Sequence, residues 1–318
     1  MRSGSLALSL LSTPLNVAVL RALEDEPLPL VDLRRAAGSP PQTTTRGHLR
    51  ALTEHGILVR RQQREFPGAV EYELGSAGVE LLKVARVLES WLAESPGEPM
   101  ALGSTAAKSS LKSLVAGWDS MIIRAFAARP LSLTELSKLI PGLNYPSLER
   151  RLGGLRMAGL VKAHTCEGRS TPYAATEWLR RAVGPLVAAT QWEREQIPTE
   201  SSPLGRLDAE AMFLLAMPML RLADPGLSTF RLGVELRSSS GDLTLAGVQA
   251  QLGDGGVSKC TTRLEGRVGA SASGPAGAWL RALSEGEAED LELSGDCGLA
   301  KEVLDGLHAA LFRTPQRA

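Results

Sequence analysis

A short sequence pattern occurs twice in this chain of 318 residues, and it limits what the chain can fold into. The segment 49–59, LRALTEHGILV, returns as 152–162, LGGLRMAGLVK, with its leucines, its glycine and the apolar residues after that glycine in matching places. An isolated tyrosine and then a tryptophan follow each segment downstream. The repeat therefore spans a whole small domain and not a single helix.

The first repeat has the pattern of three helices followed by a hairpin. Apolar residues at helical spacing, the break at Pro27 and Pro29, and a terminal Gly56 delimit the elements. We expect helices at 14–23, 30–37 and 42–54, strands at 57–59 and 70–74 joined by a basic loop at 60–68, and an amphipathic helix at 77–93. Three helices and a hairpin make a winged helix, so we expect a DNA-binding helix-turn-helix.

The second repeat follows the same plan, and a region of another kind follows it. For the second repeat we expect helices at 118–127, 132–140 and 145–158, strands at 160–163 and through 168–173, and a closing helix at 177–194. After 198–203 we expect helices at 208–223, 277–283 and 299–312, with strands at 229–237, 243–251, 258–268 and 291–294, and a hairpin turn at 253–256. The predicted fold class is mainly α with an α+β tail. The predicted domains are 1–97, 104–197 and 204–314.

The third helix of each repeat is the expected recognition helix, because its start and outer face would meet base edges in the major groove. In the first repeat the candidate contacts are short polar and basic side chains: Gln42, Thr43, Thr44, Thr45, Arg46, His48 and Arg50. In the second repeat they are Asn144, Tyr145, Ser147, Glu149, Arg150, Arg151 and Arg156. Arginine suits both phosphate and guanine contacts. The leucines of the two helices should face the core instead: Leu49, Leu52, Leu148, Leu152 and Leu155. An ordinary solvated helix face is the alternative interpretation for the polar residues.

Basic residues also occur where each hairpin would form a wing. They are Arg60, Arg61 and Arg64 in the first repeat, and Lys162 and Arg169 in the second. Such side chains can reach the minor groove or the phosphates beside a bound helix. Exposed hairpins are also often basic for solubility alone, so the wings add moderate support.

Each repeat resembles an HxlR-type winged helix, close to the wider MarR-like and ArsR-like regulators. The resemblance is carried in the second repeat by Trp118, Leu148, Leu152 and the Pro172–Tyr173 pair, and in the first by the segment VEYEL at 70–74 and Trp91. The first repeat departs from the pattern at Pro14 and Asn16, near the place of the tryptophan. Such regulators bind as dimers of single domains, so two repeats imply a covalent pseudo-dimer that binds DNA as a monomer or as a homodimer.

The C-terminal region resembles a sterol-carrier-protein type-two domain, most clearly at Ser294–Gly295–Asp296 before the last helix. The resemblance implies a sheet covered by helices with a hydrophobic tunnel. Candidate ligand-binding residues are Met212, Phe213, Met217, Phe230 and Trp279. Ordinary core packing is the stronger alternative for each of them taken singly.

The charge distribution, the cysteines and the N-terminal segment narrow the possible functions further. The chain has 35 basic and 35 acidic residues, but Lys and Arg outnumber Asp and Glu 13 to 8 in residues 101–200 and are outnumbered 11 to 15 in residues 201–318. The cysteines Cys166, Cys260 and Cys297 lack the spacing of a zinc site, and we expect reduced thiols. The apolar N-terminal segment at 5–11 has an equally apolar internal counterpart at 111–126, which favours core helices over a signal sequence.

The sequence therefore predicts a cytoplasmic DNA-binding transcription regulator, by default a repressor. We expect a hydrophobic small-molecule effector that changes the spacing of the two recognition helices, and no cofactor, metal, membrane partner or catalytic residue. A protein that sequesters a hydrophobic metabolite on a winged-helix scaffold is the alternative. An enzyme is disfavoured because the chain offers no glycine-rich nucleotide loop or Rossmann-like domain.

Overall fold

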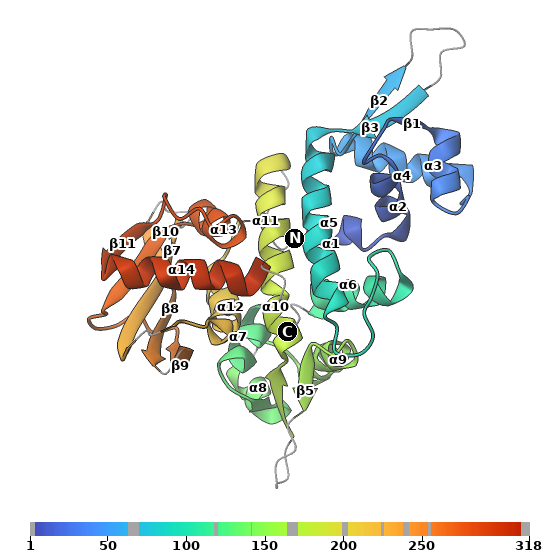
Figure 1. Cartoon of the computed structure of the whole chain (residues 1–318). Coiled ribbons are helices and arrows are strands. Elements are labelled where there is room, and N and C mark those ends of the chain that lie inside the picture. Colours follow the sequence, from blue (N-terminus) through green and yellow to red (C-terminus); the bar gives the residue numbers. More distant parts are fainter. Residues whose placement is uncertain are drawn as a thin grey trace. The chain divides into compact units, whose positions relative to one another are not determined.

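The computed structural model describes residues 4–62, 70–117, 120–140, 142–163, 171–198, 203–223, 226–237, 242–253 and 256–312. The chain divides into two compact units (Figure 1). The first unit contains Met1–Val115 and Ala188–Ser202, and the second contains Ala116–Val187 and Pro203–Ala318. Most of the second repeat thus shares a compact unit with the C-terminal region. The division splits the range 104–197, whereas the range 204–314 lies wholly in the second unit.

The first repeat folds in the predicted order, with one additional element. Its elements are α1 (Ser5–Leu11), α2 (Pro14–Ala22), β1 (Leu28–Pro29), α3 (Leu30–Ala36), α4 (Gln42–Glu54), β2 (Leu58–Gln62), β3 (Val70–Leu74) and α5 (Ser76–Ala93). The strands form a small antiparallel sheet in the order β1-β3-β2. The additional element is β1, whereas α1 is the core helix expected at 5–11 and ends just before Pro14 starts α2.

Two close approaches fix the turn between β3 and α5. A Cβ atom added to Gly75 would lie 2.4 Å from the carbonyl oxygen of Gly56, and one added to Gly78 would lie 2.2 Å from that of Ile57. Gly56 itself has a φ of +67°, as expected for a glycine that ends α4. Glycine is required here so that the start of α5 can pack on the turn that follows α4.

The first unit also includes α6 (Thr105–Gly117) as far as Val115, and the last part of α11 (Val183–Gln196) from Ala188 onward. Glu193 on α11 accepts hydrogen bonds from the backbone N–H groups of Gly4, Leu6 and Ala7, at 2.7, 2.6 and 3.0 Å. Burial raises the pKa of Glu193, and these three hydrogen bonds oppose that shift. Trp192 Nε1 donates to the carbonyl oxygen of Ala77 at 2.8 Å. A carboxylate distant in sequence therefore satisfies the free N–H groups at the start of α1.

The second repeat has the same element order around a matching sheet. After α6 come α7 (Ser120–Ala128), β4 (Leu131–Ser132), α8 (Leu133–Leu139), α9 (Tyr145–Met157), β5 (Val161–Ala163), β6 (Pro172–Ala175), α10 (Glu177–Arg181) and α11. The strand order β4-β6-β5 repeats that of β1-β3-β2. The helix predicted at 177–194 is two helices, because the chain breaks at Ala182.

The C-terminal region is a five-stranded mixed sheet with three helices packed on it. Its elements are α12 (Arg206–Ala216), a short 3₁₀ helix (Met217–Met219), β7 (Ser228–Arg237), β8 (Leu243–Gly253), β9 (Gly256–Thr261), β10 (Ala270–Pro275), α13 (Ala276–Ser284), β11 (Glu292–Gly295) and α14 (Cys297–Phe312). The strand order is β11-β10-β7-β8-β9, with β10 parallel to β7 and the other pairs antiparallel. Gly253 pairs with Gly256, which confirms the predicted hairpin turn. The strand predicted at 258–268 is confirmed only over 258–261, since β9 ends at Thr261. The strand β10 was not expected.

The second unit joins α7 of the second repeat to α12 through a buried carboxylate. Glu210 on α12 is 1% exposed and forms ion pairs with Arg124 on α7 and with Arg206, the latter at 2.9 Å. Arg124 also donates to the hydroxyl of Thr262 at 2.9 Å. Arg180 on α10 donates to the carbonyl oxygens of Leu214 and Leu215, and burial lowers its pKa. The first helix of the second repeat is thereby part of the core of this unit.

Among the described residues, no single helix is long and apolar enough to cross a membrane. The pair α1 and α2, which meet at an angle of 81°, passes a test of length and composition when taken together.

Candidate nucleic-acid interface

The recognition helix of the first repeat, α4, presents one polar face to solvent. Gln42, Thr43, Thr44, Arg46 and Arg50 are exposed on this face. Leu49 and Leu52 are buried on the opposite face, as predicted. The helix follows a tight turn in which Gly38 and Ser39 both have positive φ, at +79° and +57°. This is the arrangement of a helix-turn-helix, with α3 as the first helix and α4 as the second.

Two of the predicted contact residues on α4 point elsewhere. Thr45 is completely buried, and its hydroxyl donates to the carbonyl oxygen of Pro41 at 3.2 Å. His48 is half-buried, with its Nδ1 2.9 Å from the Oδ1 of Asn16 on α2. Asn16 is itself buried, and its Nδ2 donates to the carbonyl oxygen of Leu10 at 3.0 Å. Both residues hold α4 in place within the first unit, so we leave Thr45 and His48 out of the contact surface.

The basic side chains of the first repeat are partly neutralised. Arg50 forms an ion pair with Glu54 at 2.8 Å, and Arg61 on β2 forms one with Glu73 on β3 at 2.7 Å. Arg46 and Arg60 are exposed and form no ion pair with another described residue. Arg64, in the predicted wing, lies outside the described residues.

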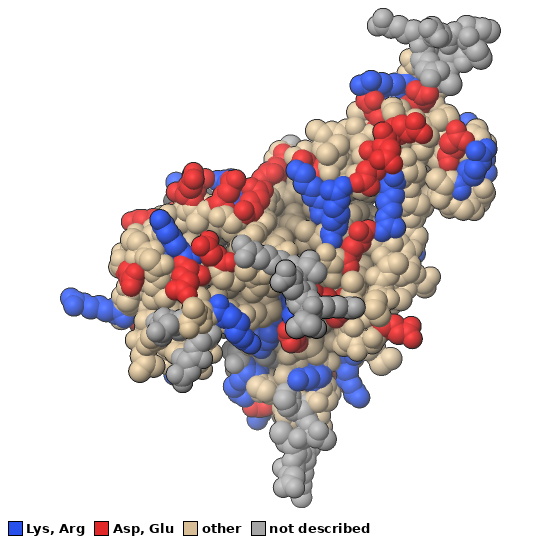
Figure 2. Space-filling view, in the orientation of Figure 1, with Lys and Arg blue, Asp and Glu red and all other residues tan. Residues whose placement is uncertain are grey.

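The helix expected to be the recognition helix of the second repeat, α9, is more basic than α4. Arg150 and Arg156 are exposed on it, and Arg151 is half-buried. No ion pair within the described part of the chain involves Arg150, Arg156 or the exposed Lys162 on β5. Leu148, Leu152 and Leu155 are buried, as predicted. Figure 2 shows Lys and Arg side chains over the elements of this repeat.

The start of α9 is built by Asn144. Its Oδ1 accepts a hydrogen bond from the N–H of Ser147 at 2.9 Å, so Asn144 caps the helix. Tyr145, one residue further, is 47% exposed, and Pro146 occupies the first turn. The cap uses the side-chain oxygen of Asn144, which leaves Tyr145 as the more available contact of the two. The wing residue Arg169 lies outside the described residues.

The predicted ligand-binding residues of the C-terminal region are packed together. Met212 is 7% exposed, and Phe213, Met217, Phe230 and Trp279 are completely buried. The rings of Phe213 and Trp279 meet edge to face with centroids 4.9 Å apart, and Trp279 Nε1 donates to the carbonyl oxygen of Gly233 at 2.8 Å. These contacts agree with the ordinary-core interpretation that the sequence left open.

The two described cysteines differ in their surroundings. Burial raises the pKa of Cys260 to about 12, which keeps it a thiol at neutral pH. Cys297 is exposed, and Cys166 lies outside the described residues. Within the described ranges, no group of three or more His, Cys, Asp or Glu residues is arranged to hold a metal ion.

Sequence reasoning missed the hydrogen bond between Asn16 and His48, which links α2 to the recognition helix. A signal was present, because Asn16 is a polar residue at a helical position between apolar ones. A buried asparagine requires hydrogen-bond partners, and His48 and Leu10 supply them.

Comparison with known families agrees with this geometry for the first repeat. Residues 10–98 match the family described as HxlR-like helix-turn-helix. A search of curated proteins found no match to the chain. The matched segment contains α2 to α5, including the helix-turn-helix pair α3 and α4. The similarity of residues 10–98 to this family supports a DNA-binding transcription regulator.

Proposed function

We propose that the chain is a transcription regulator that contacts DNA through two winged helices, with α4 and α9 as recognition helices. The match of residues 10–98 to the HxlR-like family carries the proposal for the first repeat. For the second repeat, support comes from the repeated order of elements, the repeated strand order and the exposed arginines of α9. We infer that the two repeats act as a covalent pseudo-dimer.

The contact surface that we propose is smaller than the one read from the sequence. In the first repeat it consists of Gln42, Thr43, Thr44, Arg46 and Arg60, with Arg50 and Arg61 joining once they exchange their glutamate partners for phosphate. In the second repeat it consists of Tyr145, Arg150, Arg151, Arg156 and Lys162. An exposed ion pair contributes about 0–1 kcal/mol, so the exchange can occur, but it reduces the net gain from each phosphate contact.

Repression is the direction of regulation that we propose, since a protein bound over a promoter blocks it without further contacts. A hydrophobic small molecule is the proposed effector. It would act by binding one arrangement of the recognition helices more tightly than the other.

The test is an electrophoretic mobility shift with a fragment from upstream of the protein's own gene and an unrelated fragment of equal length. We expect retardation of the first fragment at lower protein concentration, and affinity that falls steeply between 50 and 200 mM salt because phosphate contacts release counterions. Lys83→Ala is the matched control, since Lys83 is an exposed basic residue on α5, outside the proposed surface, and already paired with Glu80. The absence of any retardation at low salt would overturn the proposal and favour a sequestering protein.

A further inference from the structure

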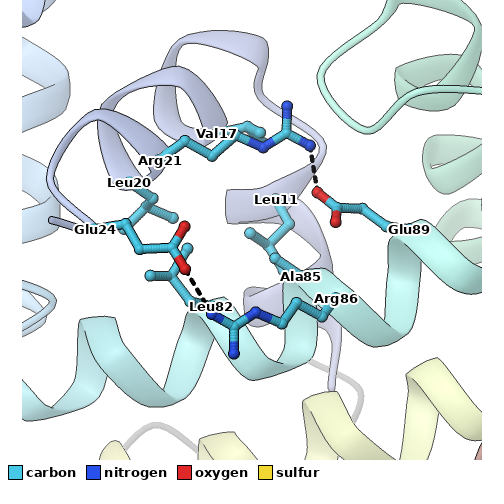
Figure 3. A pocket seen from close by; sticks show the side chains of 9 residues that line it. All are labelled: Leu11, Val17, Leu20, Arg21, Glu24, Leu82, Ala85, Arg86 and Glu89. Carbon is cyan, nitrogen blue, oxygen red and sulfur yellow. Dashed lines mark hydrogen bonds and ion pairs between the residues drawn. The ribbon is translucent and has the colours of Figure 1, made fainter.

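The first unit contains a cavity between α2 and α5 that the proposed DNA surface does not use (Figure 3). Its volume is about 190 Å³. The lining side chains come from α1, α2, the residues just after α2, and α5: Leu11, Val17, Leu20, Arg21, Glu24, Leu82, Ala85, Arg86 and Glu89. All of them belong to the first unit.

The walls of the cavity are aliphatic. Leu11, Val17, Leu20, Leu82 and Ala85 are each at most 7% exposed. Engineered cavities of roughly 150 Å³ with similar linings stay dry and bind benzene. A cavity of about 190 Å³ therefore has room for one ring with a small substituent.

Two ion pairs form the rim. In one of them α5 supplies the glutamate, and in the other α5 supplies the arginine. Arg21 of α2 pairs with Glu89 of α5, and Glu24 pairs with Arg86 of α5 at 2.5 Å. Figure 3 shows the two pairs on either side of the aliphatic walls. Because the rim holds two positive and two negative groups, it does not select a charged ligand. All four side chains are at least 38% exposed, so these pairs are weak and can open to admit a molecule.

The helix that lines one wall also supports the recognition helix. Val17 and Leu20 face the cavity from α2, and the neighbouring Asn16 makes the 2.9 Å contact with His48 on α4. A ligand that displaces α2 from α5 would therefore disturb the support of α4. Helix α2 gives the cavity a direct physical connection to the proposed DNA surface.

We infer that this cavity binds an uncharged apolar molecule of single-ring size, and that its occupancy changes the DNA affinity of the first repeat. Binding in the cavity does not depend on the proposed function, whereas the change in DNA affinity rests on it. Aliphatic walls and a charge-balanced rim are the features that define the ligand class.

Toluene is the probe for binding, with benzoate as its charged counterpart, followed by methyl NMR of the full chain. We expect saturable shifts of the Leu20 and Leu82 methyl groups with toluene, and at least tenfold weaker binding of benzoate. Ala85→Met places a side chain in the cavity and should weaken toluene binding at least tenfold. Ala93→Met, at an exposed position on the same helix, should leave it unchanged.

Val17→Ile is a milder filling variant, which reports on the cavity even if Ala85→Met does not fold. It should weaken toluene binding several-fold. The site is overturned if toluene leaves these methyl groups unmoved, if both filling variants bind it normally, or if benzoate binds more tightly than toluene.

The coupling is measured as DNA affinity with and without saturating toluene. We expect at least a fivefold change in the unmodified chain and in Ala93→Met, and none in Ala85→Met. If toluene binds in the cavity and DNA affinity does not change, the regulatory role is wrong while the site stands. If the chain binds no DNA at all, the proposed function fails, and the NMR result still decides whether the site exists.

Discussion

In the first repeat, α3 and α4 begin after Pro29 and Pro41, which make no side-chain hydrogen bond to the helix. In the second repeat, the matching helices α8 and α9 begin after Ser132 and Asn144, which accept hydrogen bonds from backbone N–H groups at 3.3 and 2.9 Å. Prolines restrict the entry of the chain but satisfy no N–H group. In the first repeat, packing and the restricted backbone of proline thus determine where these helices begin. In the second repeat, side-chain hydrogen bonds determine it.

The two proposed DNA-contact surfaces also differ in how many of their arginines form ion pairs. Arg50 and Arg61 of the first repeat are held in ion pairs, whereas Arg150 and Arg156 of the second form none with other described residues. Arginines that are already paired with glutamate contribute less binding free energy when they contact a DNA phosphate. The two repeats therefore share a fold, but we expect them to contribute unequally to DNA affinity.

The largest expected effect is a loss of unfolding free energy when the hydrogen-bond acceptor at the start of α1 is removed, compared with the acceptor at the start of α6. Glu193→Ala removes the acceptor of three backbone N–H groups at the start of α1. Each buried N–H left unsatisfied costs about 1–3 kcal/mol, so we expect the first unit to lose at least 3 kcal/mol of unfolding free energy in urea. Ser104→Ala, which removes a single cap from Ala107 at the start of α6, should cost about 1 kcal/mol. Equal losses would contradict the account.

The second effect concerns the arginines of the two recognition surfaces. Replacing Arg150 and Arg156 with Ala should weaken DNA binding roughly 100-fold and reduce the slope of log affinity against log salt by about 2, because each phosphate contact contributes about one unit. Replacing Arg50 and Arg61 with Ala should weaken it less than tenfold, since both arginines must first leave a glutamate. Fluorescence anisotropy at several salt concentrations measures both. A larger loss for the first repeat would reverse the comparison.

The third effect tests the caps of the second repeat. Ser132→Ala and Thr176→Ala each remove a side chain that accepts a hydrogen bond at a helix start, and each should cost about 1 kcal/mol of unfolding free energy. The matching substitution in the first repeat, Pro29→Ala, removes no such bond and should cost less. Chemical unfolding followed by circular dichroism compares them. If Pro29→Ala is the most damaging of the three, local hydrogen bonds do not distinguish the repeats.

The smallest effect is a pH dependence of the Ser132 cap. Hydrogen bonds from the backbone and hydroxyl of Ser132, and then from Arg129, lower the pKa of Glu135 from 4.5 to about 2. A carboxyl group with a depressed pKa stabilises the fold above its ordinary pKa, so its contribution is lost as the pH falls from about 4.5 to about 2. An NMR titration of the Glu135 carboxyl carbon should show this midpoint, and Ser132→Ala should raise it. A midpoint near 4.5 in the unmodified chain would show that the cap does not hold the carboxylate.

Periodicity predicted most of the first repeat. Helix α4 has the predicted bounds of 42–54, and its leucines face the core as expected. The same spacing could have placed Thr45, which lies four residues before Leu49 on the buried face. In the C-terminal region β10 was missed, because its sequence ASASGP lacks β-branched and aromatic residues and is held by its neighbours β7 and β11.

The candidate site was predictable only in outline. Polar residues on one helix face indicate what can reach DNA, but the pairing of Arg61 with Glu73 depends on the register of two strands. The contact between Asn16 and His48, and the cavity beside it, arise where α2 packs on α4 and α5. The polar Asn16 among apolar residues signals a buried hydrogen bond, but its partner His48 and the cavity depend on how the helices pack.

Hydroxyl-radical footprinting of the full chain on its upstream fragment tests the central claim most directly. We predict two separate protected segments, one for each recognition helix. Replacing Arg150 and Arg156 with Ala should remove one of them, and replacing Arg46 and Arg60 with Ala should weaken the other. A single segment that both double variants reduce equally would contradict two recognition helices, and protection that neither variant changes would contradict the proposed surfaces.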